Sequence, residues 1–429
     1  MLIFCWYLSF ADYNYYFDSW FIFDRIFLFF LGALSFFQPS FLILFLIQAI
    51  TLSNQYAFPN CFNYTYTDKG IIFDFILIIW IFYMAKPILK RLEWNHLYIF
   101  FFSIIGIWYL KAGIGKHQID WLTENNLYYL LSASTLFGWL SFVPNGFLIT
   151  SSTFLKDHHL IINSLTFFVE LIVPVTIFFN RRTAILGLSF YISFHLMVFL
   201  SSGIFFWKWV LLEITIISVL FFFKEQFRSF FGIKNTFIYL VVLISGFFFF
   251  ESKFLVWLDS GYTKSYHFYL KDKNQKLTKL DASFFSPYDV IFAQNRFNYL
   301  DSLPNISYTY GATTNHELLY FVRNFNPVNY YDKDLNDFRK ESGTIKYDEE
   351  KKKKLFNFLR QFTNTKLKNQ KSTISILNSP FHIWQGPNQE VFEFENQSFH
   401  SIEIIVSENV SLNNLEFFTA YSDTISVKL

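Results

Sequence analysis

Long apolar runs recur through the first 250 residues, and they constrain the fold more than any other feature of the chain. The clearest run, from Leu97 to Leu110, contains no charged side chain. Such a run needs a bilayer or a large buried core, because its burial away from water is strongly favourable. Over the whole chain, 53% of residues are hydrophobic and 62 of 429 are phenylalanine. This composition is typical of a membrane protein and not of a soluble domain.

Apolar segments that cross or nearly cross a bilayer are predicted throughout residues 1–253. The eight segments are residues 19–37, 39–53, 71–86, 94–111, 160–179, 183–204, 207–223 and 235–251. Several are shorter than the ~20 residues of a typical spanning helix, so their boundaries are loose. The expected fold of residues 1–253 is therefore an α-helical integral membrane bundle of about eight transmembrane helices.

Three basic clusters indicate the orientation of this bundle. They occupy residues 86–91, 181–182 and 224–234, and they fall on one side if the segments alternate in direction. Lysine and arginine are enriched on the cytoplasmic side of membrane proteins. We therefore expect a multi-pass protein of a bacterial inner membrane, in contact with membrane lipid. The loop from residue 111 to residue 159 and the chain after residue 251 would then face outward.

Residues 254–429 have a different pattern. The stretch "EVFEFENQSFHSIEIIVSE", residues 390–408, alternates apolar and polar side chains as a half-buried strand does. The stretch "YDEEKKKKLFNFLRQF", residues 347–362, predicts a charged helix with a solvated face. The second half is therefore expected to form an extracytoplasmic domain of mixed α and β structure.

Charge and cysteine content exclude some classes of function. The formal net charge is only +2, so no basic surface for nucleic acid is predicted. Cys5 and Cys61 are too few for a disulfide framework or a thiolate metal site, although a single bridge between them stays open. His117, His158 and His159 lack the spacing of metal ligands, and we predict no metal site.

Two ionisable residues lie deep within apolar segments. Glu170 is in "FFVELIVPVTIFF" and His195 is in "SFYISFHLMVF". Charges at this depth are costly and usually functional. The two segments are joined by a tight turn, so Glu170 and His195 are candidates for a pair. The alternatives are that Glu170 only bonds a neighbouring helix and that His195 only packs.

Two lysines stand where the apolar run ends, in "YLKAGIGKHQIDWL", residues 109–122. Burial in an apolar wall disfavours the charged form of an amine, so Lys116 is a candidate base. The alternative for Lys111 and Lys116 is that each ammonium only reaches out to the polar boundary.

The same stretch resembles a motif of the vitamin K-dependent γ-glutamyl carboxylases and their bacterial relatives, the HTTM (horizontally transferred transmembrane) domain proteins. The matching residues are Ala112, Gly113, Lys116, Asp120 and Trp121. A second stretch, "FHLMVFLSSGIFFWKWVLLEI", resembles the Phe-His helix and the Gly-x-Phe turn of these proteins, and the helix with Glu170 and Pro174 fits between the two. The resemblance covers residues 94–223. The lipase maturation factors share part of it.

The resemblance implies a lyase that carboxylates glutamate side chains. In that chemistry the motif lysine takes a proton from a reduced quinone of the vitamin K or menaquinol type, and oxygen and carbon dioxide are consumed. The implied catalytic residues are Lys116, Glu170 and His195. The residues implied to contact the substrate are Lys111, Asp120 and Trp121. An exported protein or peptide is the implied partner.

A non-catalytic maturation, assembly or anchoring protein of the same superfamily is the alternative. The carboxylases carry an Asn-His pair in an outward loop, whereas the equivalent loop here, residues 52–70, contains no histidine. This difference favours the non-catalytic alternative. The buried glutamate and histidine favour the enzyme.

Overall fold

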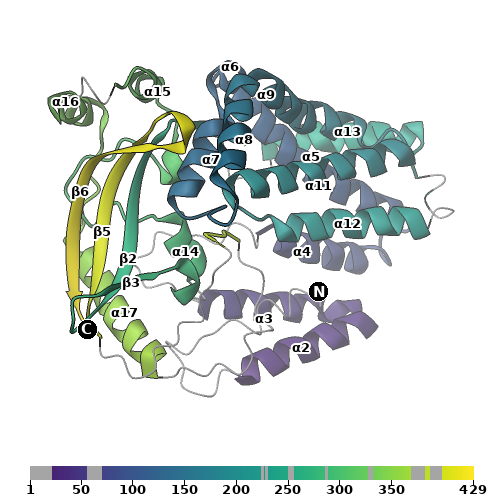
Figure 1. Ribbon diagram of the computed structural model, residues 1–429. Helices are drawn as coiled ribbons and strands as arrows, with labels where there is room; N and C mark the ends of the chain where they lie inside the picture. The colour runs from purple at the N-terminus through teal and green to yellow at the C-terminus, as the bar shows by residue number, and fades with distance from the viewer. Residues whose placement is uncertain are drawn as a thin grey trace.

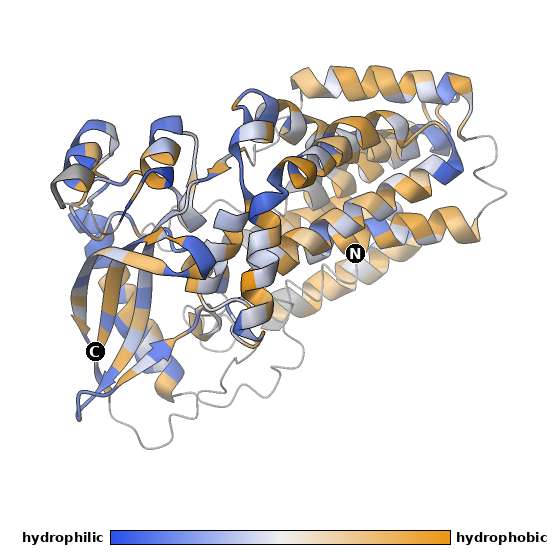
Figure 2. Cartoon of the chain, turned by 45° about the horizontal axis from the view of Figure 1, so that its top comes forward, coloured by the Kyte–Doolittle hydropathy of each residue, from blue (hydrophilic) through white to orange (hydrophobic). Residues whose placement is uncertain are grey.

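The computed structural model describes residues 22–55, 70–223, 227, 230–249, 256–285, 288–326, 332–368, 382–386 and 399–429. These residues form a helical bundle, within residues 22–249, and a sheet part, within residues 256–429 (Figure 1). The bundle is dominated by apolar residues, and the sheet part is more polar (Figure 2). Cys5, Cys61, most of the loop without histidine and the predicted boundary near residue 254 lie outside the described residues.

The predicted apolar segments fold as helices. The bundle contains α2 (Ile22–Phe37), α3 (Leu42–Gln55), α4 (Gly70–Ala85), α5 (Trp94–His117), α6 (Trp121–Glu124), α7 (Leu127–Leu136), α8 (Asn145–Asp157), α9 (His159–Phe167), the π-helical turn η2 (Phe168–Ile172), α10 (Val173–Thr176), α11 (Arg181–Ser202), α12 (Trp207–Phe222) and α13 (Ile233–Phe249). Three helical stretches, Trp94–His117, His159–Thr176 and Arg181–Ser202, are long and apolar enough to cross a membrane. The other predicted segments form shorter helices.

Helix α5 runs through the middle of the bundle. It packs along α13 and against η2 and α10, and its residues Ile105 and Ile107 join a buried apolar core with Leu188 and Tyr191 of α11. The Tyr98 ring near the start of α5 lies 5.1 Å from the Phe227 ring. The end of α12 and the start of α11 also meet at this end of the bundle.

Basic residues gather at this end of the bundle. Arg181, which begins α11, donates from Nε to the Leu220 carbonyl near the end of α12 at 2.8 Å. Lys86 lies over the Trp94 ring, 4.4 Å from its centroid, where α4 and α5 are joined. The sheet part lies at the opposite end of the bundle (Figure 1). The turns that carry basic residues and the sheet part are therefore at opposite ends.

The sheet part is built on one antiparallel sheet. Its elements are β1 (Leu258–Asp259), β2 (Tyr262–Asp272), β3 (Leu277–Leu280), α14 (Asp289–Gln294), β4 (Ala312–Thr313), α15 (His316–Arg323), α16 (Asp332–Ser342), α17 (Glu349–Lys368), β5 (Phe399–Ser411) and β6 (Phe417–Lys428). The main sheet has the order β3-β2-β5-β6, and β1 pairs with β4 separately. The predicted charged helix is α17. Its face that carries Leu355, Phe358 and Leu359 is buried in the core beneath the sheet.

The sheet part is docked on the bundle through α6, α7 and the turn between α11 and α12. Ser132 of α7 and Ser411 of β5 share a hydrogen bond of 2.5 Å between their hydroxyls. Arg323 of α15 donates to Glu124 Oε2 at 2.8 Å. The Phe205 amide donates to the His382 carbonyl at 2.7 Å. These contacts place the sheet part over the end of α5 that carries Lys116.

Candidate functional site

Lys116 and Glu170 form a buried ion pair between two helices. Lys116, in the last turn of α5, donates from Nζ to Oε1 of Glu170 in η2, and the two residues are 8% and 3% exposed. The ammonium also lies 4.9 Å from the Trp121 ring centroid and 5.9 Å from that of Phe194. Aromatic faces attract cations. The Lys116 charge is therefore balanced by one carboxylate and by aromatic rings, away from bulk water.

Local sequence explains why the two helices meet at this pair. Pro174 has no N–H to donate to the Glu170 carbonyl four residues earlier, and the turn before it is π-helical, with the Val173 amide bonded to the Phe168 carbonyl. On the facing helix, a Cβ at Gly113 would lie 3.0 Å from the Glu170 Cβ. A larger residue at this position would require the facing helix to shift, so glycine favours this close approach. Lys116 follows one turn later on the same face of α5.

A second polar centre joins three helices. The Tyr109 hydroxyl of α5 lies 2.6 Å from His195 Nε2 of α11 and donates to Glu213 Oε1 of α12 at 2.8 Å. Because that hydroxyl has a single proton and gives it to Glu213, it accepts from His195, which we infer carries its proton on Nε2. The Tyr109 ring stacks on the Tyr191 ring with 3.6 Å between centroids. Stacking and hydrogen bonds together fix the Tyr109 hydroxyl in place.

The two centres are adjacent and both hold unsatisfied atoms. Phe194, next to His195 in sequence, lies within 5.9 Å of the Lys116 ammonium and 6.4 Å of the Tyr109 ring. Glu170 Oε2, His195 Nδ1 and Glu213 Oε2 are buried without a hydrogen-bond partner among the described residues. Unpaired buried acceptors are costly and uncommon. These three atoms could accept hydrogen bonds from the hydroxyl groups of a bound ligand, or they could accept protons within the site.

The structure brings together only some of the predicted site residues. The candidate pair of Glu170 and His195 is wrong, because Glu170 bonds Lys116 whereas His195 bonds Tyr109. Two helices can be neighbours while their side chains point in different directions around each helix axis. The sequence places the two helices side by side but does not determine these directions. Trp121 is buried, and its ring lies beside the Lys116 ammonium.

The two remaining candidates lie elsewhere. The Lys111 ammonium lies over the Phe247 ring of α13, 5.7 Å from its centroid, and Lys111 is buried rather than extended to the boundary. Asp120 is exposed to solvent, and its backbone is in the left-handed region with φ of 51°. Its side chain makes no capping hydrogen bond to the start of α6. Among the contacts of the described residues, none joins Lys111 or Asp120 to Lys116.

Neither Tyr109 nor Glu213 is among the site residues predicted from the sequence. Glu213 is fully buried and accepts a hydrogen bond from Tyr109. Tyr109, Gly113 and Lys116 are spaced at i, i+4 and i+7, which places all three on one face of α5. That spacing is the signal that connects Tyr109 to the motif.

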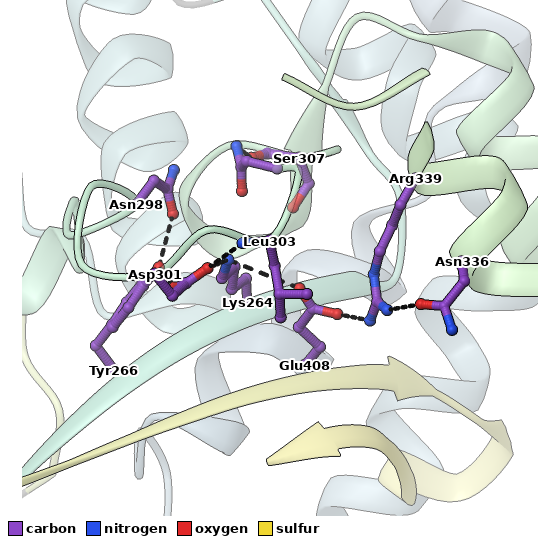
Figure 3. Close-up of polar contacts among 10 residues, drawn as sticks. Lys264, Tyr266, Asn298, Asp301, Leu303, Ser307, Asn336, Arg339 and Glu408 are labelled. Atoms are coloured by element: carbon purple, nitrogen blue, oxygen red, sulfur yellow. Dashed lines mark hydrogen bonds and ion pairs between the residues drawn. The ribbon is translucent and has the colours of Figure 1, made fainter. Parts of the chain in front are cut away.

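A third charged cluster is buried in the sheet part (Figure 3). Lys264 of β2 donates to Asp301 at 2.7 Å and lies 3.8 Å from Glu408 of β5, which also receives Arg339 of α16. Burial lowers the pKa of Lys264, and the Asp301 carboxylate opposes this shift. The two cations and two anions balance each other, so the cluster ties two strands, a loop and α16 together.

Comparison of the chain with protein-family models, with curated proteins and with solved structures found no match. The resemblance to the carboxylases therefore stays a prediction carried by the motif residues. Within the described ranges, no three His, Cys, Asp or Glu side chains gather closely enough to hold a metal ion.

Proposed function

We propose that this chain is an integral membrane protein of the HTTM class and that it carries a quinol-dependent site for carboxylation of glutamate side chains. One observation carries the proposal: Lys116 of the Ala-Gly-x-x-Lys motif is buried against Glu170 of the Glu-x-x-x-Pro helix. The resemblance relates the two motifs only by their order in the chain. Their meeting in space supports a common site.

The proposed topology has the basic turns in the cytoplasm and the sheet part outside. Support comes from the three helical stretches of spanning length, and from the position of Arg181 and Lys86 at the end of the bundle away from the sheet. The shorter helices would complete about eight crossings of the inner membrane. Cysteines placed at Lys90 and at Lys340 should therefore react with an impermeant reagent from opposite sides. Labelling of both from one side would contradict this topology.

The unsatisfied atoms of the site fit a reduced quinone, which has two hydroxyl donors. When bound, a reduced quinone supplies, with oxygen, the base that removes a proton from the γ-carbon of a glutamate side chain. For Nζ of Lys116 to accept a proton, its own proton must first pass to the Glu170 carboxylate, to which it already donates. Nζ of Lys116 is then the proton acceptor. Glu170 holds the displaced proton, and His195 Nδ1 is a second acceptor nearby.

Quinone content tests this proposal directly. The detergent-extracted protein should retain a quinone. Added quinol should slow the acylation of Lys116 by an amine-reactive reagent, and peptide mass spectrometry measures this rate. Lys156, exposed at the end of α8 and bonded to Asn413, is the internal control and should react at the same rate with and without quinol. Equal reaction of Lys116 in both conditions would favour the maturation or anchoring role instead.

A further inference from the structure

Asp259 and Asn125 join the sheet part to the bundle by a reciprocal pair of hydrogen bonds. The Asp259 amide donates to Asn125 Oδ1 at 2.8 Å, and Asn125 Nδ2 donates to Asp259 Oδ2 at 3.1 Å. Trp257 Nε1 donates to the other carboxylate oxygen at 3.2 Å. Asp259 and Asn125 are 3% and 0% exposed. The first residues of the sheet part are thus fixed to the segment that follows α6.

Asn163 continues this connection into the helix that carries Glu170. Asn163 Nδ2 donates to the carbonyls of Asn125 at 2.8 Å and Leu122 at 2.9 Å, and the residue is fully buried. It precedes Glu170 by seven residues on the same continuous helical stretch, in which Glu170 belongs to the π-helical turn η2. A shift of Asn163 along or around α9 is therefore passed to Glu170.

Trp121 connects the same hydrogen bonds to Lys116. Its carbonyl lies 3.4 Å from Asn163 Nδ2, and its ring lies 4.9 Å from the Lys116 ammonium. Its side chain packs with Leu258, the neighbour of Asp259, and with Leu319 of α15. Two of the groups around the Lys116 ammonium, the Glu170 carboxylate and the Trp121 ring, thus have positions that depend on Asn163.

We propose that Asp259, Asn125 and Asn163 are positioning residues, through which the sheet part holds Glu170 and Trp121 against Lys116. The inference rests on the proposed function for the importance of the Lys116 and Glu170 pair. It adds that the sheet part sets the geometry of the site and does not only cover it. Its consequence is that loss of a bond far from Lys116 loosens the enclosure of the Lys116 ammonium.

The test uses the full-length, detergent-extracted protein and a small acetylating reagent that reacts with amines. Mass spectrometry of the peptide that contains Lys116 measures how fast Lys116 is acetylated. Asp259→Ala and Asn163→Ala should each raise this rate roughly fivefold, the factor that corresponds to one lost buried hydrogen bond. Asp259→Asn should raise the rate less than Asp259→Ala does, because its amide oxygen can still accept from Asn125, although its NH2 group cannot accept from Trp257. This partial rescue distinguishes the loss of a specific hydrogen bond from the loss of side-chain volume or charge.

Ser132→Ala is the matched control. It removes a buried hydrogen bond across the same junction, between α7 and β5, without touching the three positioning residues. It should leave the acetylation rate of Lys116 at the parent value. Parent rates in Asp259→Ala and Asn163→Ala, or an equal rise in Ser132→Ala, would overturn the inference. Protection by quinol is a separate measurement on the parent protein, so its failure would reject the proposed function without deciding the positioning role.

Discussion

The Lys116 ammonium donates to the Glu170 carboxylate across the contact between α5 and η2, and both side chains are buried. The two residues stand 54 positions apart in the sequence. Gly113 permits the contact, and the π-helical turn before Pro174 carries Glu170 there. The pair is therefore a product of two local sequence features on separate helices.

This pair should show strong energetic coupling. Lys116→Met leaves the Glu170 charge unpaired, and Glu170→Gln leaves the ammonium unpaired, so each should destabilise the protein by about 3 to 5 kcal/mol. The double variant removes both charges and should lose less than the sum of the two single losses. Denaturant unfolding in detergent measures all four proteins. Additive losses would show that the two groups do not interact.

The Tyr109 hydroxyl should stabilise the second centre. Tyr109→Phe leaves His195 Nε2 and Glu213 Oε1 without this partner, at an expected cost of about 1 to 3 kcal/mol. Tyr191→Phe is a matched control, because Tyr191 stacks on the same ring and its buried hydroxyl makes no described hydrogen bond. Thermal unfolding should separate the two variants. Equal melting temperatures would contradict the hydrogen-bonding role of Tyr109.

The contribution of Asp259 and Asp289 to stability should fall as pH rises from about 4 to about 7. Burial raises the pKa of both Asp259 and Asp289 to about 7, against about 3.9 when unfolded. A raised pKa means that the folded state binds the proton more tightly. The resulting stability is complete below pH ~4 and is lost as pH rises through 7.

A double variant isolates this effect. Asp259→Asn with Asp289→Asn should flatten the dependence of melting temperature on pH in this window. Burial lowers the pKa of His267 to about 4, so His267 makes stability rise with pH between about 4 and 6.5, opposite to the two aspartates. His267 is present in both proteins, so its contribution cancels when the double variant is compared with the parent. A double variant that keeps the slope of the parent would show that other groups are responsible.

Substitution of Glu408 should destabilise the sheet part more than substitution of an exposed acid. Glu408→Gln leaves Lys264 and Arg339 with Asp301 as the remaining carboxylate of the cluster, at an expected cost of about 3 to 5 kcal/mol. Glu349→Gln is the control, because its pair with Lys353 on α17 is exposed and its loss should change the stability little. Chemical denaturation compares the two. Similar losses would mean that the buried cluster is not more coupled than a surface pair.

The apolar pattern predicted the helices of the bundle well but not their lengths. Segments 94–111, 160–179 and 183–204 correspond to the three long stretches, and α5 continues past its predicted end to His117. That extension was not foreseen because Lys111 and Lys116 look like a boundary in the sequence. In the fold both are buried, since one lies over Phe247 and the other bonds Glu170.

The residues of the site were easier to predict than their partners. Glu170, His195 and Lys116 stand out as ionisable groups among apolar ones. Which of them meet depends on the direction of each side chain and on the close approach at Gly113, and neither is encoded in hydropathy. In the sheet part, alternation predicted the strand that became β5, but the order β3-β2-β5-β6 depends on long-range pairing.

The most direct measurement of the central claim is quinol oxidation by membranes that contain Lys116→Arg. Arginine keeps the charge and can still pair with Glu170, but it stays protonated and cannot accept a proton. Membranes with the parent protein should convert added quinol to its epoxide in the presence of oxygen and carbon dioxide. Lys116→Arg should lower this rate by about 100-fold or more, and Lys156→Arg should leave it unchanged. A Lys116→Arg protein as active as the parent, or a parent that forms no epoxide, would contradict the proposed chemistry.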